Sequence, residues 1–410
     1  MTRGIGIEMG ITTNSPAAAR LLDLTRLVRR AGRPFTGVDR VEKAYLDHFL
    51  SLDTPLFGLV RSALGYVLLD RAGCAKLRDK LTDHDFGPAD RLSRIKRGMD
   101  PLRARAEADL RRICRDRCLP ISLPRMLRKH LPKGTCYLNV GHSNLTDRVI
   151  SALRLIPGAR IGVMIHDTIP LDFPQYQRKK TAEAFARFLK CAVRRADLII
   201  CNSRQTKADV LRHAAPQTPK TLVAHLGVHE PTPGIAPSGP WDGHPYFVCL
   251  GTIEPRKNHA LLLDLWGDIP EAHLLICGHR GWENDAIFAR LDAKPPLVHE
   301  LPGLSDPEVS GLLKDSRGLL FPSLAEGYGL PPIEAAAMGV PVVCNDLPIY
   351  REVLGNIPVY ASVSDRYLWR HEIRGLANSD QNRGGAEKSA GMGWQPPSWD
   401  AHFKTVLRMI

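Results

Sequence analysis

The chain has 410 residues, of which 44% are hydrophobic and 24% are charged, and its formal net charge is +13. This composition is typical of globular proteins and excludes a disordered, collagen-like or coiled-coil chain, while the length predicts two to four domains. The charge is divided unevenly, because residues 1–230 hold 41 lysines and arginines against 22 acidic residues, whereas residues 231–410 hold 15 against 21. The first part is therefore expected to face an anionic partner, such as a phospholipid surface, a phosphorylated substrate or a nucleic acid.

Short apolar runs recur along the whole chain, and each is followed by a polar, helix-like stretch. Unalternating runs of this length predict strands that are buried on both faces. Their alternation with helices predicts right-handed βαβ units and parallel sheets. The runs lie at 22–28, 66–69, 137–140, 161–165, 198–201, 222–226, 246–250, 273–277, 297–301, 319–321 and 340–344.

Residues 231–245 are rich in proline and glycine and predict a linker, at the point where the charge changes sign. The simplest interpretation is two doubly wound, Rossmann-like domains, at 1–230 and 246–393, with a ligand cleft where the carboxyl ends of their strands face each other. A polar, Gly-rich loop at 378–398 precedes an amphipathic stretch. We expect that stretch, residues 394–410, to be a helix that packs back on the first domain.

Two basic stretches in the first part predict amphipathic helices. Residues 91–133 hold fourteen lysines and arginines against four acidic residues. They carry an apolar stripe, and Arg111, Arg112 and Arg115 lie mostly outside it. This pattern, together with a second basic stretch at 178–195, suggests docking on an anionic membrane. Core-packed helices with a solvated basic side are the alternative, and for residues 178–195 we weigh the two equally.

No membrane span or secretory signal is predicted. No stretch approaches the roughly 18–20 apolar residues of a membrane-crossing helix, and the N-terminal residues lack the apolar core of a signal peptide. We therefore expect a cytoplasmic protein. The nine cysteines are scattered, so we interpret them as reduced thiols and not as a zinc site or a disulfide framework.

The densest functional signal is FPSLAEGYGLPPIEAAAMGVPVV at 321–343. A strand is followed by a loop with Gly327 and Gly329 and then by a helix that begins at Pro331 and Pro332, and the N–H groups near Gly329 and Leu330 suit an anion at the helix start. Glu326 and Glu334 are spaced as E-x₇-E. One carboxylate can meet a sugar hydroxyl and the other the two hydroxyls of a ribose. A glutamate that favours a helix N-terminus, beside a solvated one, is the alternative.

This segment resembles the family-four retaining glycosyltransferases, which are of the glycosyl transferases group 1 type. We expect the protein to be a bacterial member of this family. Further matches are YFVCLGTIEPRKNHALLLDLW, LLICGHRGWEN, LPGLSDPEVSGLLKDSRGLLFPS and GVPVVCNDLPIYREVLG, in the expected order. The first part matches more sparsely, through FTGVDRV, YLNVGHSNL, MIHDTIPL and DLIICNSRQTKADVL. The resemblance implies the GT-B fold, with two Rossmann-like domains across a cleft, and transfer of a hexose, as a guess mannose, from a nucleotide-diphosphate sugar.

Adjacent cations follow the strand at 246–250. Arg256 and Lys257 on this loop, with Gly251 before them, suit a leaving diphosphate, and the resemblance implies the same role. It also implies that His166 contacts the donor sugar or the acceptor, and that Gly37 belongs to a glycine loop near the donor. That loop usually carries two glycines, whereas this chain has Thr36 and Gly37.

Other strand ends predict further lining residues. Gly278 and Gly303 follow two strands of the second part and are placed to hold the nucleobase. Asn202 and Ser203 end a strand of the first part and either line the cleft or cap the next helix.

The sequence predicts neither a cofactor nor a metal site. A D-x-D metal motif is not apparent, and Asp83 and Asp85 in D-H-D are interpreted as a solvated turn. The expected partners are a nucleotide-sugar donor, a glycan or lipid-linked acceptor and an anionic membrane surface, without nucleic acid. Two alternatives stay open: a nucleotide-sugar epimerase, which needs no acceptor, and a nucleic-acid-binding protein with a decayed transferase fold.

Overall fold

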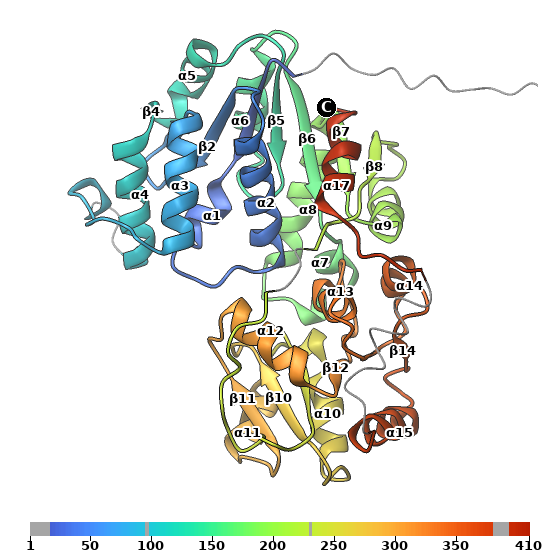
Figure 1. Ribbon diagram of the computed structural model, residues 1–410. Coiled ribbons are helices and arrows are strands. Elements are labelled where there is room, and N and C mark those ends of the chain that lie inside the picture. The colour runs from blue at the N-terminus through green and yellow to red at the C-terminus, as the bar shows by residue number, and fades with distance from the viewer. Residues whose placement is uncertain (1–16, 95–97, 229–231, 380–392) are drawn as a thin grey trace, which may run out of the picture.

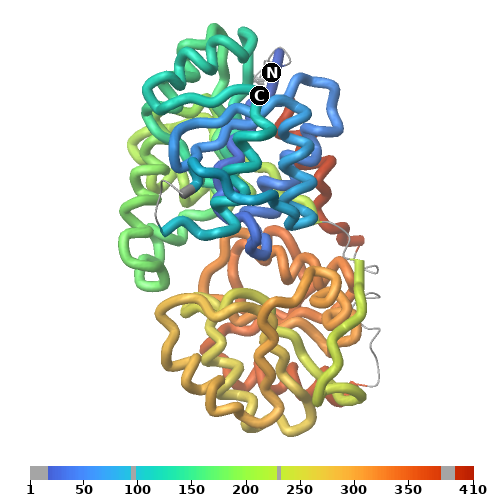
Figure 2. The backbone as a smooth tube through the Cα atoms, turned by 90° about the vertical axis from the view of Figure 1, so that its left-hand side faces the viewer, coloured from blue at the N-terminus to red at the C-terminus, as the bar shows by residue number. Residues whose placement is uncertain are grey.

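The computed structural model describes residues 17–94, 98–228, 232–379 and 393–410. They form two α/β domains, which Figures 1 and 2 show stacked end to end. Three features of the sequence lie wholly or partly outside these residues: the N-terminal segment before residue 17, the first residue of the linker at 231, and most of the Gly-rich loop at 378–398.

The first domain contains an eight-stranded sheet with the order β4-β3-β2-β1-β5-β6-β7-β8. Strand β3 is antiparallel to β2 and β4, and the other pairings are parallel. The prediction of a parallel sheet is therefore wrong at this edge, because residues 62–65 join β2 to β3 as a hairpin without a crossover helix. The strands are β1 Ala19–Asp23, β2 Leu56–Arg61, β3 Tyr66–Leu69, β4 Asp116–Cys118, β5 Thr135–Asn139, β6 Arg160–Ile165, β7 Leu198–Cys201 and β8 Thr221–Val223.

Helices cover both faces of this sheet, because successive strand residues point to opposite sides. Leu22 of β1 packs in one hydrophobic core with α2, α3 and α4, whereas Leu21 packs in another with α5, α6 and α8. The α-helices are α1 Thr25–Arg29, α2 Gly37–Ser51, α3 Arg71–Asp83, α4 Pro101–Ile113, α5 Leu123–His130, α6 Asp147–Arg154, α7 Ile169–Asp172, α8 Thr181–Arg195 and α9 Arg204–Ala214, and the 3₁₀ turns are η1 Leu92–Arg94, η2 Pro120–Ser122 and η3 Pro174–Tyr176.

The second domain contains a six-stranded parallel sheet with the order β11-β10-β9-β12-β13-β14. Phe247 of β9 packs in a core with α10 and α15, whereas Val248 joins the core that also includes α13 and α14. The elements are β9 Tyr246–Leu250, η4 Pro255–Lys257, α10 His259–Trp266, β10 His273–Cys277, α11 Asp285–Asp292, β11 Val298–Leu301, α12 Asp306–Asp315, β12 Gly318–Phe321, α13 Leu330–Ala337, β13 Val342–Cys344, α14 Pro348–Leu354, β14 Val359–Tyr360 and α15 Arg366–Ala377.

The first predicted strand, at 22–28, is correct only for its first two residues. Strand β1 ends at Asp23, whose Oδ1 accepts the backbone N–H of Thr25 at 3.0 Å, and the short helix α1 follows. Strand β2 was not predicted, because Gly58 interrupts its apolar run. A side chain there would meet Leu24 and Cys74, since a Cβ built on Gly58 would lie 2.7 and 2.9 Å from them.

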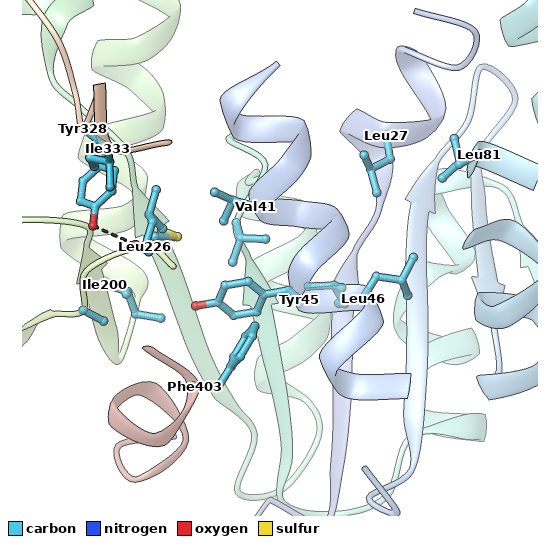
Figure 3. Close-up of a cluster of buried hydrophobic side chains, with 14 of the residues drawn as sticks. Leu27, Val41, Tyr45, Leu46, Leu81, Ile200, Leu226, Tyr328, Ile333 and Phe403 are labelled. Atoms are coloured by element: carbon cyan, nitrogen blue, oxygen red, sulfur yellow. Dashed lines mark hydrogen bonds between the residues drawn. The ribbon is translucent and has the colours of Figure 1, made fainter. Parts of the chain in front are cut away.

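The C-terminal helix α17, Trp399–Leu407, returns to the first domain as predicted. Figure 3 shows Phe403 directed at Tyr45 of α2, and their ring centroids are 5.0 Å apart in an edge-to-face arrangement. The Tyr45 hydroxyl lies 2.8 Å from Nε2 of the buried His402. The last element of the chain therefore completes the core of the first domain.

The basic stretch at 91–133 contains helix α4, and the arginines of this helix bind within the domain. Arg111 is buried against Asp90 at 2.6 Å, and Arg112 pairs with Asp109. The expectation that Arg111 and Arg112 are free docking charges is therefore wrong, while Arg115 is exposed. Within the described residues, no helix is long and apolar enough to cross a bilayer.

Candidate active site at the domain interface

The loop between β12 and α13 brings the backbone close to the other domain. Gly329 has φ +84°, which glycine adopts readily, and a Cβ there would lie 2.4 Å from the Tyr350 ring. A Cβ on Gly327 would lie 2.7 Å from the backbone oxygen of His166 in the first domain. Only glycine fits these positions, so this loop of the second domain reaches the end of β6 in the first.

A cluster of four charged side chains lies beside this loop. Lys257 Nζ is 2.6 Å from Glu326 Oε1, and Arg256 is 2.8 Å from the same oxygen. Arg256 also contacts Glu254 at 2.6 Å and donates to the Ala325 carbonyl at 2.7 Å. The two cations predicted for the diphosphate and the carboxylate predicted for the sugar therefore meet in one cluster, after the neighbouring strands β9 and β12.

Burial and charge act in opposite directions on Glu326. Desolvation by burial would raise the pKa of Glu326, but Arg256 and Lys257 reverse this and lower it to about 2. Burial also lowers the pKa of Lys257, against the attraction of Glu326. A carboxylate with such a pKa is ionised at neutral pH, so Glu326 serves as a hydrogen-bond acceptor and not as a proton donor.

His166 follows β6 and faces the Gly327 loop from the first domain. It is 5% exposed, and its Nε2 lies 2.7 Å from the Val140 carbonyl. Burial lowers the pKa of His166 to about 4, so the ring is neutral near pH 7. With Nε2–H donating to Val140, Nδ1 is left as an acceptor for a hydroxyl.

His142 is a neighbour of His166 that the sequence did not reveal as a site residue. Its ring centroid is 4.8 Å from that of His166, and its Nε2 accepts the backbone N–H of His166 at 3.2 Å. Its backbone has the unusual φ of +53°. His142 therefore fixes the position at which β6 delivers His166.

Asp167, the next residue, also lies in this interface. Burial raises the pKa of Asp167 to about 6, against the opposing effect of Arg256. Its Oδ1 accepts the backbone N–H of Ile169 at 3.1 Å. That bond fits the expected role of orienting the loop after β6.

Glu334, the fifth residue of α13, binds an arginine from the opposite domain. Its Oε1 is 2.8 Å from Arg40 of α2, and Arg40 also contacts Asp306 of α12 at 2.6 Å. Gly37, one turn before Arg40, faces Leu330, since its Cβ would lie 3.6 Å from that side chain. The helix that carries the predicted glycine loop therefore lies at the start of α13, and it supplies a cation that the sequence analysis missed.

Three further glycines occupy the ends of β9, β10 and β11 or the turns after them. Gly251 has φ +134°, and its Cβ would lie 3.1 Å from Lys257 Cε. A Cβ on Gly278 would lie 2.0 Å from the Gly251 carbonyl oxygen, and Gly303 has φ +79° with its Cβ position near the His279 ring. The first two glycines therefore permit close packing under Lys257, whereas Gly303 lies in the turn after β11.

Asn202 and Ser203 at the end of β7 have separate structural partners. Asn202 is buried and its Nδ2 donates to the His166 carbonyl at 2.7 Å. Ser203 accepts the backbone N–H of Thr206 at 2.9 Å and caps helix α9. Asn202 thus supports the His166 loop, while Ser203 makes the contact expected of a helix cap.

Contacts beyond these side chains also join the two domains. Trp282 donates its indole N–H to the Tyr176 carbonyl at 3.1 Å, and Arg178 lies 4.8 Å over the Trp282 ring. Glu352 of α14 accepts the backbone N–H groups of Arg204 and Gln205 at the start of α9. These contacts hold the carboxyl ends of both sheets against each other.

Metal ligands do not gather in the described part of the chain, where no group of three or more histidine, cysteine or acidic side chains could hold an ion. Asp83 is the last residue of α3, and the following His84 has φ +53°. D-H-D therefore forms a helix end and turn. All nine cysteines are free thiols, and six of them are buried.

The second part of the chain matches a known protein family. Residues 235–357 match the sequence profile of the family described as Glycosyl transferases group 1. The matched residues contain Arg256, Lys257, Glu326 and Glu334. The resemblance inferred from the sequence of the second part is therefore confirmed.

Several curated relatives are bacterial mannosyltransferases. The chain is 32% identical over 220 residues to the serotype-specific mannosyltransferase WbdA of Escherichia coli, covering 48% of this chain and 27% of that protein. It is 26% identical over 221 residues to the O-antigen chain mannosyltransferase RfbU of Salmonella typhimurium, covering 52% and 60%. The matches thus span less than two thirds of the length of these relatives.

Solved structures share the fold over nearly the whole chain. The Anabaena protein Alr3699/HepE, determined in complex with UDP-glucose, has a TM-score of 0.61 with 14% sequence identity, covering 95% of this chain and 97% of that one. The S. aureus protein TarM has a TM-score of 0.54 over 72% of this chain. At this identity the likeness concerns the fold alone, and it confirms the predicted GT-B class.

Proposed function

We propose that this protein is a retaining, metal-independent glycosyltransferase that moves a hexose, which we take to be mannose, from a nucleotide-diphosphate sugar to a hydroxyl of a glycan or lipid-linked acceptor in cell-surface polysaccharide synthesis. The observation that carries the proposal is the cluster of Arg256, Lys257 and Glu326, next to Gly327, where the loop packs against the His166 backbone of the other domain. The match of residues 235–357 to the group 1 glycosyltransferases supports the reaction class, and the mannosyltransferase relatives support the sugar.

Departure of the diphosphate from the anomeric carbon is the difficult step. Arg256 and Lys257 would bind the phosphate oxygens as negative charge develops there, together with the backbone N–H groups near Gly329 and Leu330. Preorganised cations can take this role without a metal ion. In the proposed reaction the protein therefore needs no metal and no cofactor, and the nucleotide-sugar is a co-substrate.

The sugar would lie between Glu326 and His166. The ionised Glu326 accepts hydrogen bonds from ring hydroxyls, and the neutral His166 offers Nδ1 as a second acceptor from the opposite domain. Glu334 would accept the ribose hydroxyls, while Arg40 keeps its carboxylate charged. Gly278 and Gly303 remain candidates for contacts with the nucleobase.

The acceptor hydroxyl would attack from the face that the diphosphate leaves, with retention of configuration. Its proton would pass to the departing phosphate, so no side chain is assigned as general base. Because the contacts between the domains surround this site, closure would exclude water and limit hydrolysis of the donor. The basic first domain would handle the acceptor on the cytoplasmic face of a membrane, as a peripheral protein.

The test combines binding and transfer. Guanosine and uridine diphosphate forms of mannose, glucose and N-acetylglucosamine are screened by thermal shift, since a donor at about 100 times its Kd stabilises the fold by about 2.7 kcal/mol. The stabilising donor is then incubated with and without a lipid-linked glycan, and the anomeric configuration of the product is read by NMR. Turnover of the donor to an epimer without acceptor, or an inverted product, would contradict the proposal.

A further inference from the structure

Two large apolar side chains stand exposed at the turn that joins β4 to α5. Leu119 is 65% exposed and Ile121 is 85% exposed, two residues apart in sequence. Figure 1 shows β4 and α5 at an outer corner of the first domain, with the second domain beyond the opposite end. Burying a side chain of this size normally stabilises a protein, so its exposure at a rigid turn points to a partner surface.

Cations surround this apolar turn. Residues 115–133, called the β4–α5 corner below, hold six lysines and arginines against one acidic residue, Asp116. Asp116 lies 2.6 Å from His130 and 3.2 Å from Lys129, and these contacts lower its pKa to about 2. The remaining cations are exposed and make no ion pair with any described residue: Arg115, Arg117, Arg125, Arg128 and Lys133.

Helix α5 holds the corner firmly on the domain. Its apolar residues Leu123, Met126 and Leu127 are buried in the core beside α6, and Arg125 and Arg128 lie on its exposed side. The apolar face of the helix is therefore already occupied by the protein itself. Leu119 and Ile121 lie outside that face, so they are available to a partner without unfolding of the helix.

Among the described residues, the two other basic helices of the first domain, α4 and α8, differ from this corner. Helix α8 exposes Arg187, Lys190 and Arg194, but its apolar residues Phe185 and Leu189 are buried. Helix α4 uses most of its arginines in internal ion pairs. Unpaired cations and protruding apolar side chains occur together at the β4–α5 corner.

We propose that the β4–α5 corner docks on an anionic phospholipid bilayer, with Leu119 and Ile121 in the boundary between headgroups and acyl chains. Arginine and lysine side chains around the turn would bind the anionic headgroups. The inference deepens the proposed function and rests on it for its purpose. It places the acceptor-handling domain on the surface that holds lipid-linked acceptors.

Cosedimentation with vesicles tests the docking directly. The full chain should bind vesicles of phosphatidylcholine and phosphatidylglycerol in equal parts, ignore pure phosphatidylcholine, and be released as the Debye length falls to about 3 Å at about 1 M salt. Each cation near an anionic surface strengthens binding about fivefold, equivalent to about 1 kcal/mol. The triple variant Arg125→Gln, Arg128→Gln and Lys133→Gln should therefore bind about 100-fold more weakly.

A matched variant on α8 distinguishes the effect of the corner residues from the effect of a lower net charge. Arg187→Gln, Lys190→Gln and Arg194→Gln remove the same number of charges and should weaken binding far less. Ile121→Ser with Leu119→Ser keeps every charge and should weaken binding about tenfold or more, since both side chains leave the bilayer. Unchanged melting temperatures and nucleoside diphosphate affinities show that these exposed replacements leave the fold and the donor site intact.

Several results would overturn the inference. One is equal binding of the protein to anionic and neutral vesicles, and another is an equal loss of vesicle affinity in the corner and α8 variants. The others are unchanged vesicle affinity in the Leu119→Ser and Ile121→Ser double variant, and salt-reversible binding to RNA in place of vesicles. The measurement does not depend on catalysis. Vesicle binding without any donor binding would support docking and contradict the proposed function. Donor-dependent transfer without vesicle binding would support the proposed function and contradict docking.

Discussion

Replacement of Arg40 by glutamine tests whether a residue of the first domain completes the nucleotide site of the second. The Glu334 side chain is 18% exposed, and its Oε1 lies 2.8 Å from Arg40. Burial raises the pKa of Glu334, and Arg40 acts against this effect. Without the arginine charge, the pKa of Glu334 should rise further, because the same burial is then less compensated.

The expected effect follows from what a ribose needs. Its two hydroxyls donate hydrogen bonds, so they require the ionised carboxylate, and the protonated form loses acceptor capacity. A hydrogen bond to a charged group contributes about 1.5–3 kcal/mol. Because Arg40 and Glu334 are partly exposed, we take the lower end. Arg40→Gln should therefore weaken nucleoside diphosphate binding about tenfold near neutral pH, a change of about 1.4 kcal/mol.

Calorimetric titration at several pH values shows in which direction the nucleoside diphosphate affinity changes with pH. The ligand binds the deprotonated carboxylate, so affinity is full above the pKa of Glu334 and falls as the pH drops through it. In Arg40→Gln this fall should begin at a higher pH than in the wild type, and Arg40→Lys should restore the profile in part. Asp306→Asn is the matched control, because Asp306 is 71% exposed and such a pair contributes little.

Three outcomes would refute this reasoning. Wild-type affinity and pH profile in Arg40→Gln would show that the ion pair does not support nucleotide binding. Tighter binding in Arg40→Gln would show that the arginine competes with the ribose. An equal loss in Asp306→Asn would assign the effect to contact between the domains and not to the charge of Glu334.

The remaining predictions concern the site and the C-terminal helix. Arg256→Ala and Lys257→Ala should each lower turnover by about 10²–10³, as expected for one preorganised charge contact, and near-normal turnover of the double variant would exclude the phosphate assignment. Calorimetry should show that Glu334→Gln weakens nucleoside diphosphate binding whereas Glu326→Gln spares it but impairs transfer; equal affinities would end that division of roles. Phe403→Ala should destabilise the first domain by about 3–5 kcal/mol in denaturant unfolding while leaving nucleotide affinity unchanged, and a weaker affinity would contradict the placement of α17.

The second domain and its charged cluster could be inferred from the sequence because short-range patterns determine them. Each of its main strands is a single apolar run, and β9 and β10 have the predicted bounds. Parallel strands deliver their following loops to one edge of the sheet. Arg256 follows β9 and Glu326 follows β12, and because these parallel strands are neighbours, both side chains lie at the same edge.

The contribution of Arg40 could not be inferred in this way. It lies on a helix among 41 basic residues of the first part, and its contact with Glu334 depends on how two separately folded domains pack. His142 lies within YLNVGHSNL, but its role depends on a left-handed backbone position that this motif does not reveal. The β2–β3 hairpin was missed because Gly58 divides an apolar run, and the packing of that glycine against Leu24 and Cys74 appears only in three dimensions.

The charge arrangement explains how one cluster can serve both parts of a nucleotide-sugar. Arg256 and Lys257 share Glu326, and Arg256 also pairs with Glu254, so each cation of this cluster has a carboxylate partner. Unpaired buried charges would be costly, and the pairs avoid that cost. A diphosphate bound to both cations would compete with Glu326 for them. The carboxylate oxygens of Glu326 would then be free to accept hydrogen bonds from the hydroxyls of the adjoining sugar. The ion pairs that stabilise the site would thus also couple phosphate binding to sugar orientation.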